Sequence, residues 1–570
     1  MYNPIADHQF VHGVYCPSTI NKYCTDALIA NVKDVESGES RLHIIRKPKF
    51  QFWVTKPALR TYAEKRECCP VDETDMYITD YDTMADSIGK ALGYSFSFTN
   101  KRKFLESPYV YGADIDPLVR MKLEYIQACE KSINYFKIGC IDIENSVLGD
   151  NQIIILSYTD FHTRTTYCGV LNSWAETNID ELQERTTKEH ALFREGLNNE
   201  AKSIWDKKPF SVIYNLFDHE RDLLLWVFRC LHDCKPDFCG VWNISYDIPY
   251  LLDRAMFRGI NAEDLFCHPD VPVEFRFMTF KEDTSTIHSA HITDRWHQVV
   301  CPGYTKWYDP MCLYSRLRVV ESKLPFYTLD FVGNKIIGSG KMRFGVNDTH
   351  HAMQTKDKVG YCVYNTLDTI IPVMNDAVTN DVVSVSILTG CSLISQFASQ
   401  TVQLKAFFFE YCMVHNLVPG TVAGSQEKET DVYIGNVGGA VLNPQLMRLK
   451  GARCIKEVDI ATNIYKLCCD IDYTSQYPSA LLSFNISKET KLTTFIHLDN
   501  SPFTLDEVLE TKDVIDDKGK KNPRARANSE HMFNFLCQYT ATRENAVPLC
   551  KAFNLVGYKD MLALWDNINS

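Results

Sequence analysis

Three short apolar runs in the middle of this chain constrain its fold most strongly. They have the length and residue types of β-strands and cover residues 135–142, 152–158 and 165–170. Helix-like and strand-like segments then alternate, at 220–234, 238–243, 249–258 and 356–379. Closely spaced strands form a meander, and an alternation of strands and helices builds a mixed sheet flanked by helices. The pattern therefore predicts an α/β multidomain protein.

Length and charge limit the architecture and the partners. At 570 residues the chain is too long for one hydrophobic core, which predicts roughly three or four domains. Its composition, 45% hydrophobic and 23% charged, is that of a folded globular protein. The net charge of −12 excludes a uniformly basic DNA-coating surface, because phosphate binding requires Lys and Arg. Any contact with nucleic acid is therefore expected to be local, and clustered carboxylates can serve it by holding divalent cations.

The 21 cysteines do not predict a disulfide framework. The chain opens without the basic and apolar segments of a secretory signal, so we expect reduced, intracellular thiols. Cys230 and Cys234 lack a second ligand pair at zinc-finger spacing and are expected to pack. No uncharged apolar run of about 18 or more residues occurs, so no membrane span is predicted.

Carboxylates lie at the ends of two predicted strands and on one predicted helix. Asp142 and Glu144 are two residues apart on a strand, so both project to one side. Asp247 follows a second strand, and Tyr364 and Asp368 are one helical turn apart. The alternatives are a solvated strand end for the pair, a helix cap for Asp247 and a core position for Tyr364. Together, four acids and a phenol could form one cation site.

Three segments carry a resemblance to a known family. Asp142-Ile-Glu144, Asn243-Ile-Ser-Tyr-Asp247 and Tyr364-Asn-Thr-Leu-Asp368 resemble, in order and separation, the Exo I, Exo II and Exo III motifs of family-B DNA polymerases. These motifs belong to the 3′→5′ proofreading exonuclease domain. The likeness covers about residues 135–485 and is closest to polymerases of tailed phages. It implies a ribonuclease-H-like exonuclease domain.

The resemblance also implies a set of metal ligands. Two Mg²⁺ ions, which Mn²⁺ can replace, would lie about 3.5–4 Å apart on the scissile phosphate. Asp142, Glu144 and Asp368 would ligate the first ion, and Asp142 and Asp247 would hold the second. Tyr364 would orient the attacking water.

Four further residues are expected to contact DNA. By the resemblance, Asn243 and Tyr246 would line the groove for the single strand, where aromatic stacking tolerates any base. Gly438 and Gly439 stand in a segment that resembles the family's Y-x-G-G linker motif, which contacts the template. A glycine turn without function is the alternative for these two residues.

A second set of motif residues lies nearer the end of the sequence. Asp472-Tyr-Thr-Ser-Gln-Tyr-Pro-Ser479 resembles motif A of the family-B palm, D-x-x-S-L-Y-P-S. Asp472 would then bind both Mg²⁺ ions of a polymerase site, and Tyr477 would exclude a 2′-hydroxyl group. The backbone near Ser475 and Gln476 would meet the dNTP triphosphate. Gln476 replaces the family's leucine, which puts the shape of the nucleotide pocket in doubt. A strand-end Asp beside a structural turn is the alternative.

Neither K-x-x-x-N-S-x-Y-G of motif B nor D-T-D of motif C follows Asp472. The leading hypothesis is the N-terminal part of a split family-B DNA-directed DNA polymerase, completed for synthesis by a second chain. One alternative is a free-standing 3′→5′ DNA exonuclease with a vestigial palm, and another is a non-catalytic replisome scaffold. A natural gene split, an interrupted gene and a truncation all stay open.

This hypothesis predicts four segments. They are an N-terminal mixed α/β domain at 1–134, the exonuclease domain at 135–380, a helical connection at 381–430 that packs with the N-terminal domain, and a partial palm of a polymerase right hand at 431–570. The expected partners are primer–template DNA, a single-stranded 3′ end, dNTPs and the second polymerase chain, with a clamp or helicase left open. By the resemblance, the expected location is the cytoplasm of an infected bacterial cell.

Overall fold

The computed structural model describes residues 2–421 with internal gaps, and two short strands beyond them. The gaps are at 19–24, 63–64, 95–106, 130, 132–134, 148, 150, 284–290, 319–323, 345–348 and 389–399. The strands are β17 (Val514–Ile515) and β18 (Lys521–Asn522), which pair antiparallel. The chain divides into two compact units, Met1–Ser425 and Gln426–Ser570, and the account below concerns the first. The finer division at 134, 380 and 430 stays a prediction.

Two small antiparallel sheets form the N-terminal region. The first has the order β1-β2-β3, with β1 (His8–Cys16), β2 (Ala27–Asp34) and β3 (Ser40–Arg46). The second has the order β6-β4-β7, with β4 (Phe50–Thr55), β6 (Thr74–Thr79) and β7 (Val110–Tyr111). Helix α3 (Pro117–Ala128) packs on the first sheet and α1 (Met84–Leu92) on the second. The apolar runs at 42–45 and 50–54 lie within β3 and β4.

A segment after residue 400 packs against this N-terminal region. Strand β16 (Leu417–Pro419) pairs antiparallel with β5 (Cys68–Pro70). Phe409 of α16 (Gln400–Val414) packs against Val119 and Leu123 of α3. These contacts connect the segment after residue 400 to the N-terminal sheets.

A six-stranded mixed sheet is the centre of the unit. Its order is β11-β10-β9-β8-β12-β15. The strands are β8 (Ile138–Asn145), β9 (Ile153–Asp160), β10 (Thr165–Leu171), β11 (Ser211–Phe217), β12 (Phe238–Gly240) and β15 (Lys306–Tyr308). Strands β8, β9 and β10 form the predicted antiparallel meander, whereas β11, β12 and β15 join in parallel. The predicted α/β layer is therefore confirmed.

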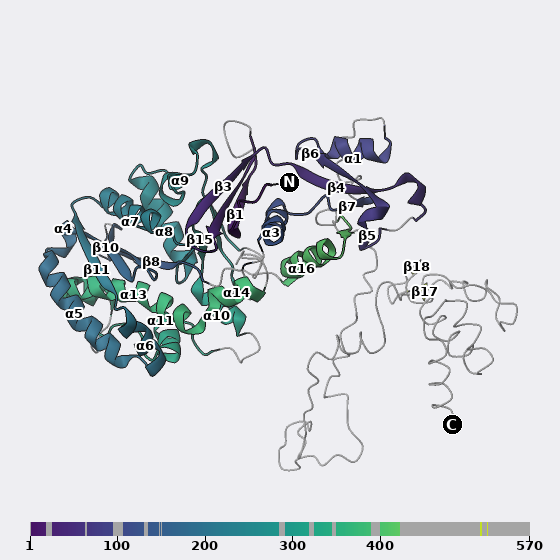
Figure 1. Cartoon of the computed structure of the whole chain (residues 1–570). Helices are drawn as coiled ribbons and strands as arrows, with labels where there is room; N and C mark the ends of the chain where they lie inside the picture. Colours follow the sequence, from purple (N-terminus) through teal and green to yellow (C-terminus); the bar gives the residue numbers. More distant parts are fainter. Residues whose placement is uncertain are drawn as a thin grey trace, which may run out of the picture. The chain divides into compact units, whose positions relative to one another are not determined.

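Helices cover both faces of this sheet (Figure 1). Those that position the site are α7 (Glu220–Cys234), α8 (Ile244–Phe257) and α13 (Lys358–Thr379). The others are α4 (Asn172–Ala175), α5 (Ile179–Gly196), α6 (Asn199–Lys207), α9 (Ala262–Phe266), α10 (Pro310–Leu317), α11 (Leu329–Ile336), α12 (His350–Lys356) and α14 (Asp381–Leu388). Two further strands pair antiparallel outside the main sheet. They are β13 (Thr279–Lys281) and β14 (Gln298–Val300).

Helix α13 packs against β8, β9 and β10 and is buried along most of its length. Its N-terminus is capped by the Asp357 side chain, which accepts the backbone N–H of Gly360 at 2.8 Å. It ends at Asn380, whose left-handed conformation terminates the helix. The prediction of a helix from residue 356 to 379 is confirmed to within two residues. Buried helical and strand side chains pack together here, so the residues of α13 that face the sheet are held firmly.

The start of α8 differs from the prediction. The helix was expected from Pro249, but it begins at Ile244. Asp247 lies in its first turn, so the alternative interpretation of Asp247 as the helix cap is wrong. Asn243 precedes the helix in the left-handed conformation (φ 66°). The physical reason is a contact from distant sequence, because the Asp309 carboxylate accepts the N–H of Ile244 at 3.1 Å. A side chain from another segment thus satisfies the helix end.

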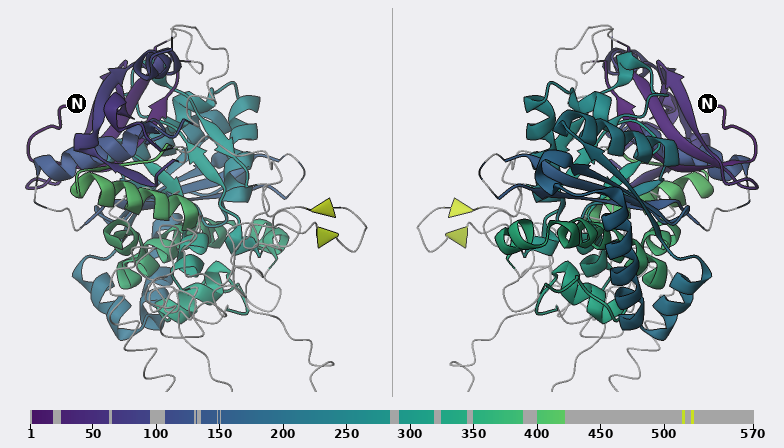
Figure 2. Two further views of the ribbon diagram at one scale, coloured as in Figure 1. Left: turned by 90° about the vertical axis from the view of Figure 1, so that its right-hand side faces the viewer. Right: turned by 90° about the vertical axis from the view of Figure 1, so that its left-hand side faces the viewer.

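A buried ion pair joins the N-terminal sheet to the main sheet. Lys33 of β2 and Asp237, the residue before β12, form an ion pair with both side chains fully buried. The same carboxylate accepts Asn31 Nδ2 at 3.0 Å, Ser40 Oγ at 3.2 Å and the backbone N–H of Lys137 at 2.7 Å. The side views of Figure 2 show the purple N-terminal strands against the teal part of the unit. The contact fixes the N-terminal sheet beside the strand that leads toward Asp247.

Two predictions about the whole chain can be compared with its described part. Among the helices that the structure describes, none has the length and apolar character needed to cross a bilayer. The cysteines of the described segments, Cys230 and Cys234 among them, are free thiols. Neither of these two belongs to the group of metal-ligating side chains found in those segments.

Candidate active site

The predicted acids converge from three elements of the main sheet and its helices. Strand β8 carries Asp142 and Glu144, and α13 carries Asp368. One carboxylate oxygen of each lies within 4.8 Å of the others. Glu144 and Asp368 are buried, whereas Asp142 is partly exposed. Asp247 of α8 is buried and lies outside this closest group.

The pKa shifts of the acids show which charges act on one another, and they include Asp247. Burial raises the pKa of Asp142 well above its ordinary value, and the charges of Asp247, Asp368 and Glu144 raise it further. Burial likewise raises the pKa of Asp247, with Glu144 and Asp309 adding to the effect. Four carboxyl groups in a dry site repel one another unless a cation is present. The charge of Asp247 therefore acts on the carboxyl group of Asp142.

The donor set fits a divalent cation that prefers oxygen. All of these ligands are carboxylates, which suit Mg²⁺. One oxygen, Asp368 Oδ1, is buried and makes no hydrogen bond in the part of the chain that the structure describes. An unpaired buried carboxylate oxygen costs free energy, which a bound cation would recover. Asp142, Glu144 and Asp368 could therefore hold one ion between β8 and α13.

Lys341 lies in the same site and was missed by the motif analysis. Its Nζ lies 2.5 Å from Asp368 Oδ2 and donates to the Tyr364 hydroxyl at 2.9 Å. Burial acts to lower the pKa of Lys341, but the Asp368 carboxylate and the Tyr364 phenol outweigh it, so the pKa is raised. The ammonium therefore stays charged among the acids. The surrounding sequence, Gly338-Ser-Gly-Lys341, lacks the spacing of a phosphate loop. It therefore does not predict that Lys341 lies among the acids.

Three more side chains of α12 and α13 hold the carboxylates. The Tyr361 hydroxyl donates to Glu144, and Asn365 Nδ2 donates to Asp142 Oδ2 at 2.7 Å. His350 Nδ1 lies 3.6 Å from Glu144 Oε2. Such contacts orient metal ligands and tune their basicity. Tyr361 and Asn365 stand seven and three residues before Asp368, so helical spacing could have identified them.

Asp309 and Glu220 place helix α8. Asp309 Oδ2 accepts the N–H of Ile244, and burial raises the pKa of Asp309 to about 6. Glu220 accepts Arg254 at 2.5 Å and the N–H of Ile153 at 2.8 Å, which connects the C-terminal half of α8 to β9. Both ends of the helix are therefore anchored, which fixes the position of the first turn that carries Asp247.

The residues predicted to line a DNA groove lie at this helix. Tyr246 is 53% exposed, and its hydroxyl donates to Asn145 Oδ1 at 3.2 Å. Its ring stacks on that of Tyr250, with centroids 6.1 Å apart and planes at 22°. Asn243 accepts a hydrogen bond from Ser245 Oγ at 2.9 Å. Their contact with DNA stays a prediction.

The other predicted site residues lie outside the residues that the structure describes. These are Gly438, Gly439, Asp472, Ser475, Gln476 and Tyr477. Their expected roles in template, nucleotide and metal binding stay predictions. The site that can be described is therefore the one formed by β8, α8 and α13.

Comparison with known proteins identifies the class of this region. Residues 149–298 match the family described as DNA polymerase family B, exonuclease domain. The match contains Asn243, Tyr246 and Asp247, while Asp142 precedes it and Asp368 follows it. This part of the chain is therefore similar to the exonuclease domain of family-B DNA polymerases.

A relative adds a weaker likeness. The chain is 22% identical over 299 residues to DNA polymerase 120R of Invertebrate iridescent virus 3. The matched region is 48% of this chain and 23% of the viral polymerase, so the chain spans less than a quarter of that relative. The general resemblance to a family-B exonuclease is confirmed by these matches, while the tailed-phage type stays a prediction.

Proposed function

We propose that this chain is a two-metal 3′→5′ DNA exonuclease that proofreads for a family-B DNA polymerase. The observation that carries the proposal is the convergence of Asp142, Glu144 and Asp368 within 4.8 Å. One oxygen of this cluster, Asp368 Oδ1, is buried and has no hydrogen-bond partner among the described residues. The match of residues 149–298 to a polymerase exonuclease domain supports DNA as the substrate. Mg²⁺ is the proposed cofactor, and Mn²⁺ should replace it.

The acids, Tyr364 and Lys341 have different roles in the proposed reaction. Asp142, Glu144 and Asp368 hold the first ion, and Asp142 and Asp247 hold the second. Ions held by these residues would supply Lewis-acid chemistry, which would lower the pKa of an attacking water and stabilise the leaving 3′ oxygen. Tyr364 orients the water, and Lys341 fixes the Tyr364 hydroxyl by donating to it.

Lys341 has a second part in this mechanism. Its ammonium lies among acids that must accept a phosphodiester, so it offsets negative charge that develops in the transition state. The exposed ring of Tyr246 and the side chain of Asn243 line the path of the single strand. An unpaired 3′ end reaches such a groove more readily than a paired one, which is the basis of proofreading.

The function is tested with a 5′-labelled single strand in Mg²⁺. We expect wild-type chain to shorten the strand stepwise from its 3′ end. Lys341→Met should slow this about 100-fold, because it removes one charged donor from the reacting centre. Lys341→Arg should recover part of the rate. The product ladder on a denaturing gel gives the rates.

Two measurements make this result specific. Lys335→Met, at an exposed lysine of α11, should retain the wild-type rate. Mn²⁺ binding, followed by electron paramagnetic resonance, should not weaken in Lys341→Met, because a competing cation has been removed. Shortening from the 5′ end, or a wild-type rate in Lys341→Met, would contradict the proposed site.

We further propose that Asp472 belongs to a polymerase site completed by a second chain. The motif A segment supports this, since nothing in nuclease chemistry requires Asp472, Tyr477 or Pro478. Ser475 and Gln476 would bind the dNTP, and Gly438 and Gly439 the template. A free-standing exonuclease with a vestigial palm is the alternative.

DNA synthesis distinguishes these two alternatives. This chain alone should incorporate no nucleotide, because a two-metal site needs a further essential carboxylate beside Asp472, which motif C would supply. Mixed with a chain that bears motifs B and C, it should extend a primed template, and Asp472→Ala should remove that extension. Extension by the Asp472→Ala mixture would refute the shared site, and its absence from every mixture would favour the vestigial palm. Primer extension with labelled dNTP measures both.

A further inference from the structure

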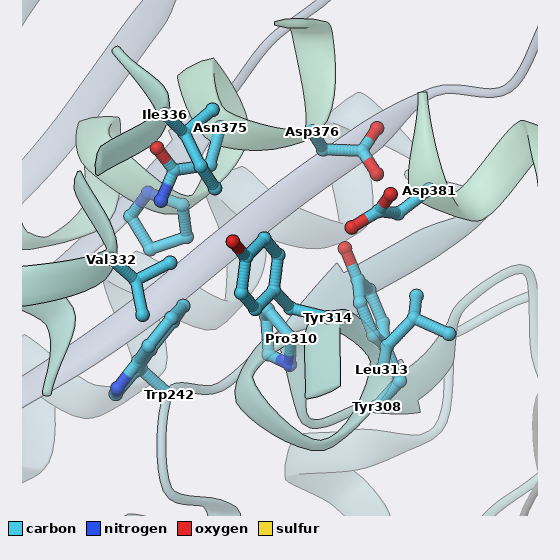
Figure 3. Close-up of a pocket in the computed structure, with 11 residues that line it drawn as sticks. Trp242, Tyr308, Pro310, Leu313, Tyr314, Val332, Ile336, Asn375, Asp376 and Asp381 are labelled. Carbon is cyan, nitrogen blue, oxygen red and sulfur yellow. The ribbon is translucent and has the colours of Figure 1, made fainter. Parts of the chain in front are cut away.

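The small pocket beside the C-terminal half of α13 is part of the packing around that helix (Figure 3). Tyr314 and Asp381 line it, and Arg318 contacts both of them. The guanidinium donates to the Asp381 carboxylate by two hydrogen bonds of 3.0 Å and lies 3.9 Å from the centre of the Tyr314 ring. These groups have their partners within the protein, whereas the N-terminal region contains a strand whose backbone groups face solvent.

That strand is β6, one edge of the sheet β6-β4-β7 (Figure 1). Among the described residues it pairs only with β4, and consecutive residues of such an antiparallel ladder bond alternately toward the neighbouring strand and away from it. The N–H of Lys56 donates to the carbonyl of Glu73 at 3.0 Å, which places Glu73 among the residues that bond toward β4. Counted in twos from there, the N–H and C=O groups of Thr74, Met76 and Ile78 point toward the open edge.

The side chains beside these free backbone groups are apolar and exposed. Met76 is 52% exposed and Ile78 is 56% exposed. They are two residues apart and therefore project to one face of the sheet. The opposite face is covered, because Ile88 of α1 packs there with Phe52 and Val54. An open edge with exposed apolar side chains can pair with a further strand, which would cover both its backbone groups and its side chains.

Charge limits which strand can pair here. Residues 71–86 contain six acids and neither Lys nor Arg. Glu73 is paired with Arg66 and Asp80 with Lys49. The other acids make no ion pair within the described ranges, and they are Asp72, Asp75, Asp82 and Asp86. This surface attracts a basic segment and repels a second copy of β6, whose acids would lie directly beside its own.

We propose that the edge of β6 binds an extended basic segment of a partner protein by strand addition. The backbone of the segment would pair with the free groups of Met76 and Ile78. Its aliphatic side chains would cover these two residues, and Lys or Arg at the alternate positions would project to the other face, to which Asp75 also projects. The proposal does not rest on the exonuclease activity.

The test uses fluorescence anisotropy with the whole chain and a labelled peptide of sequence Lys-Val-Lys-Val-Lys-Val-Lys. At low ionic strength we expect a Kd of about 100 μM or lower, weakening as salt is added. A peptide with N-methyl groups on its valines should not bind, because the N–H groups that face β6 are removed. N-methyl groups on the lysines instead should leave binding largely intact, and a peptide with Glu in place of Lys should not bind.

Variants of the chain locate the binding. Met76→Lys combined with Ile78→Lys should weaken binding of the basic peptide about tenfold or more, because the apolar contact is lost and positive charge is added. Ile213→Lys, at an exposed residue of the edge strand β11, should bind like wild type. Circular dichroism reports whether each variant is folded.

The comparison among peptides needs no variant, so it holds even where a substitution unfolds the chain. Equal binding of the two N-methylated peptides would overturn strand addition and leave attraction by charge alone. Wild-type affinity in the folded double variant would place the peptide elsewhere. Absence of binding by the basic peptide would also overturn the proposal, and the acids would then serve only to prevent β6 from pairing with another copy of itself.

Discussion

A chain that carries both Asp142→Asn and Glu144→Gln should lose 3′ nucleotide removal by about a thousandfold or more. Both substitutions keep the side-chain shape and remove the negative charge. The site would then hold at most a weakly bound ion, and stabilisation of several kcal/mol would be missing from the transition state. Stepwise shortening of a 5′-labelled strand in Mg²⁺ measures the rate.

Controls separate loss of chemistry from loss of fold. Asp180→Asn with Glu184→Gln changes two exposed acids of α5 in the same way and should cleave like wild type. Mn²⁺ binding should fall in the site variant and persist in this control. Cleavage by the site variant at the wild-type rate would place the nuclease elsewhere or reveal a contaminant.

The second large effect concerns stability. Asp237→Asn should lower the free energy of unfolding by about 3–5 kcal/mol, because it leaves the Lys33 ammonium buried without a counter-ion. Burial already acts to lower the pKa of Lys33, and the Asp237 carboxylate opposes that effect. Urea unfolding, followed by circular dichroism, measures the change.

A double substitution tests this explanation. Lys33→Met combined with Asp237→Leu should recover much of the lost stability, since an apolar pair of similar volume avoids the desolvation of both charges. Lys131→Met, at an exposed pair with Glu36, should have little effect. A double variant as unstable as Asp237→Asn would show that the hydrogen bonds of the carboxylate matter more than the ion pair.

Much of the exonuclease region could be predicted from the sequence, because its strands and helices are regular and strongly patterned. Helix α7 has the predicted bounds, 220 and 234, since its apolar residues recur at helical spacing. The meander was predictable because short connections leave neighbouring strands little choice but to pair. Asp142 and Glu144 were recognisable for a related reason: period-two alternation puts both on one side of β8.

Contacts between residues far apart in the sequence could not be predicted, and they explain the features that were missed. The first residue of α8 was mispredicted because its N-terminus is satisfied by Asp309, which lies 65 residues further along the chain. Lys341 gave no signal because its importance comes only from its closeness to Asp368, 27 residues away. Neither contact leaves a local pattern that a motif or a periodicity could detect.

The contact between Lys341 and Asp368 bears on how the exonuclease survives without its ions. Clustered acids inside a protein normally strain the fold when their metal is stripped away. Here the Lys341 ammonium neutralises part of the acid cluster, so we expect removal of Mg²⁺ to stop the proposed cleavage without unfolding the domain. Because Lys341 also contacts the Tyr364 hydroxyl, it stays in the site, and we expect activity to return without refolding when the ions are restored.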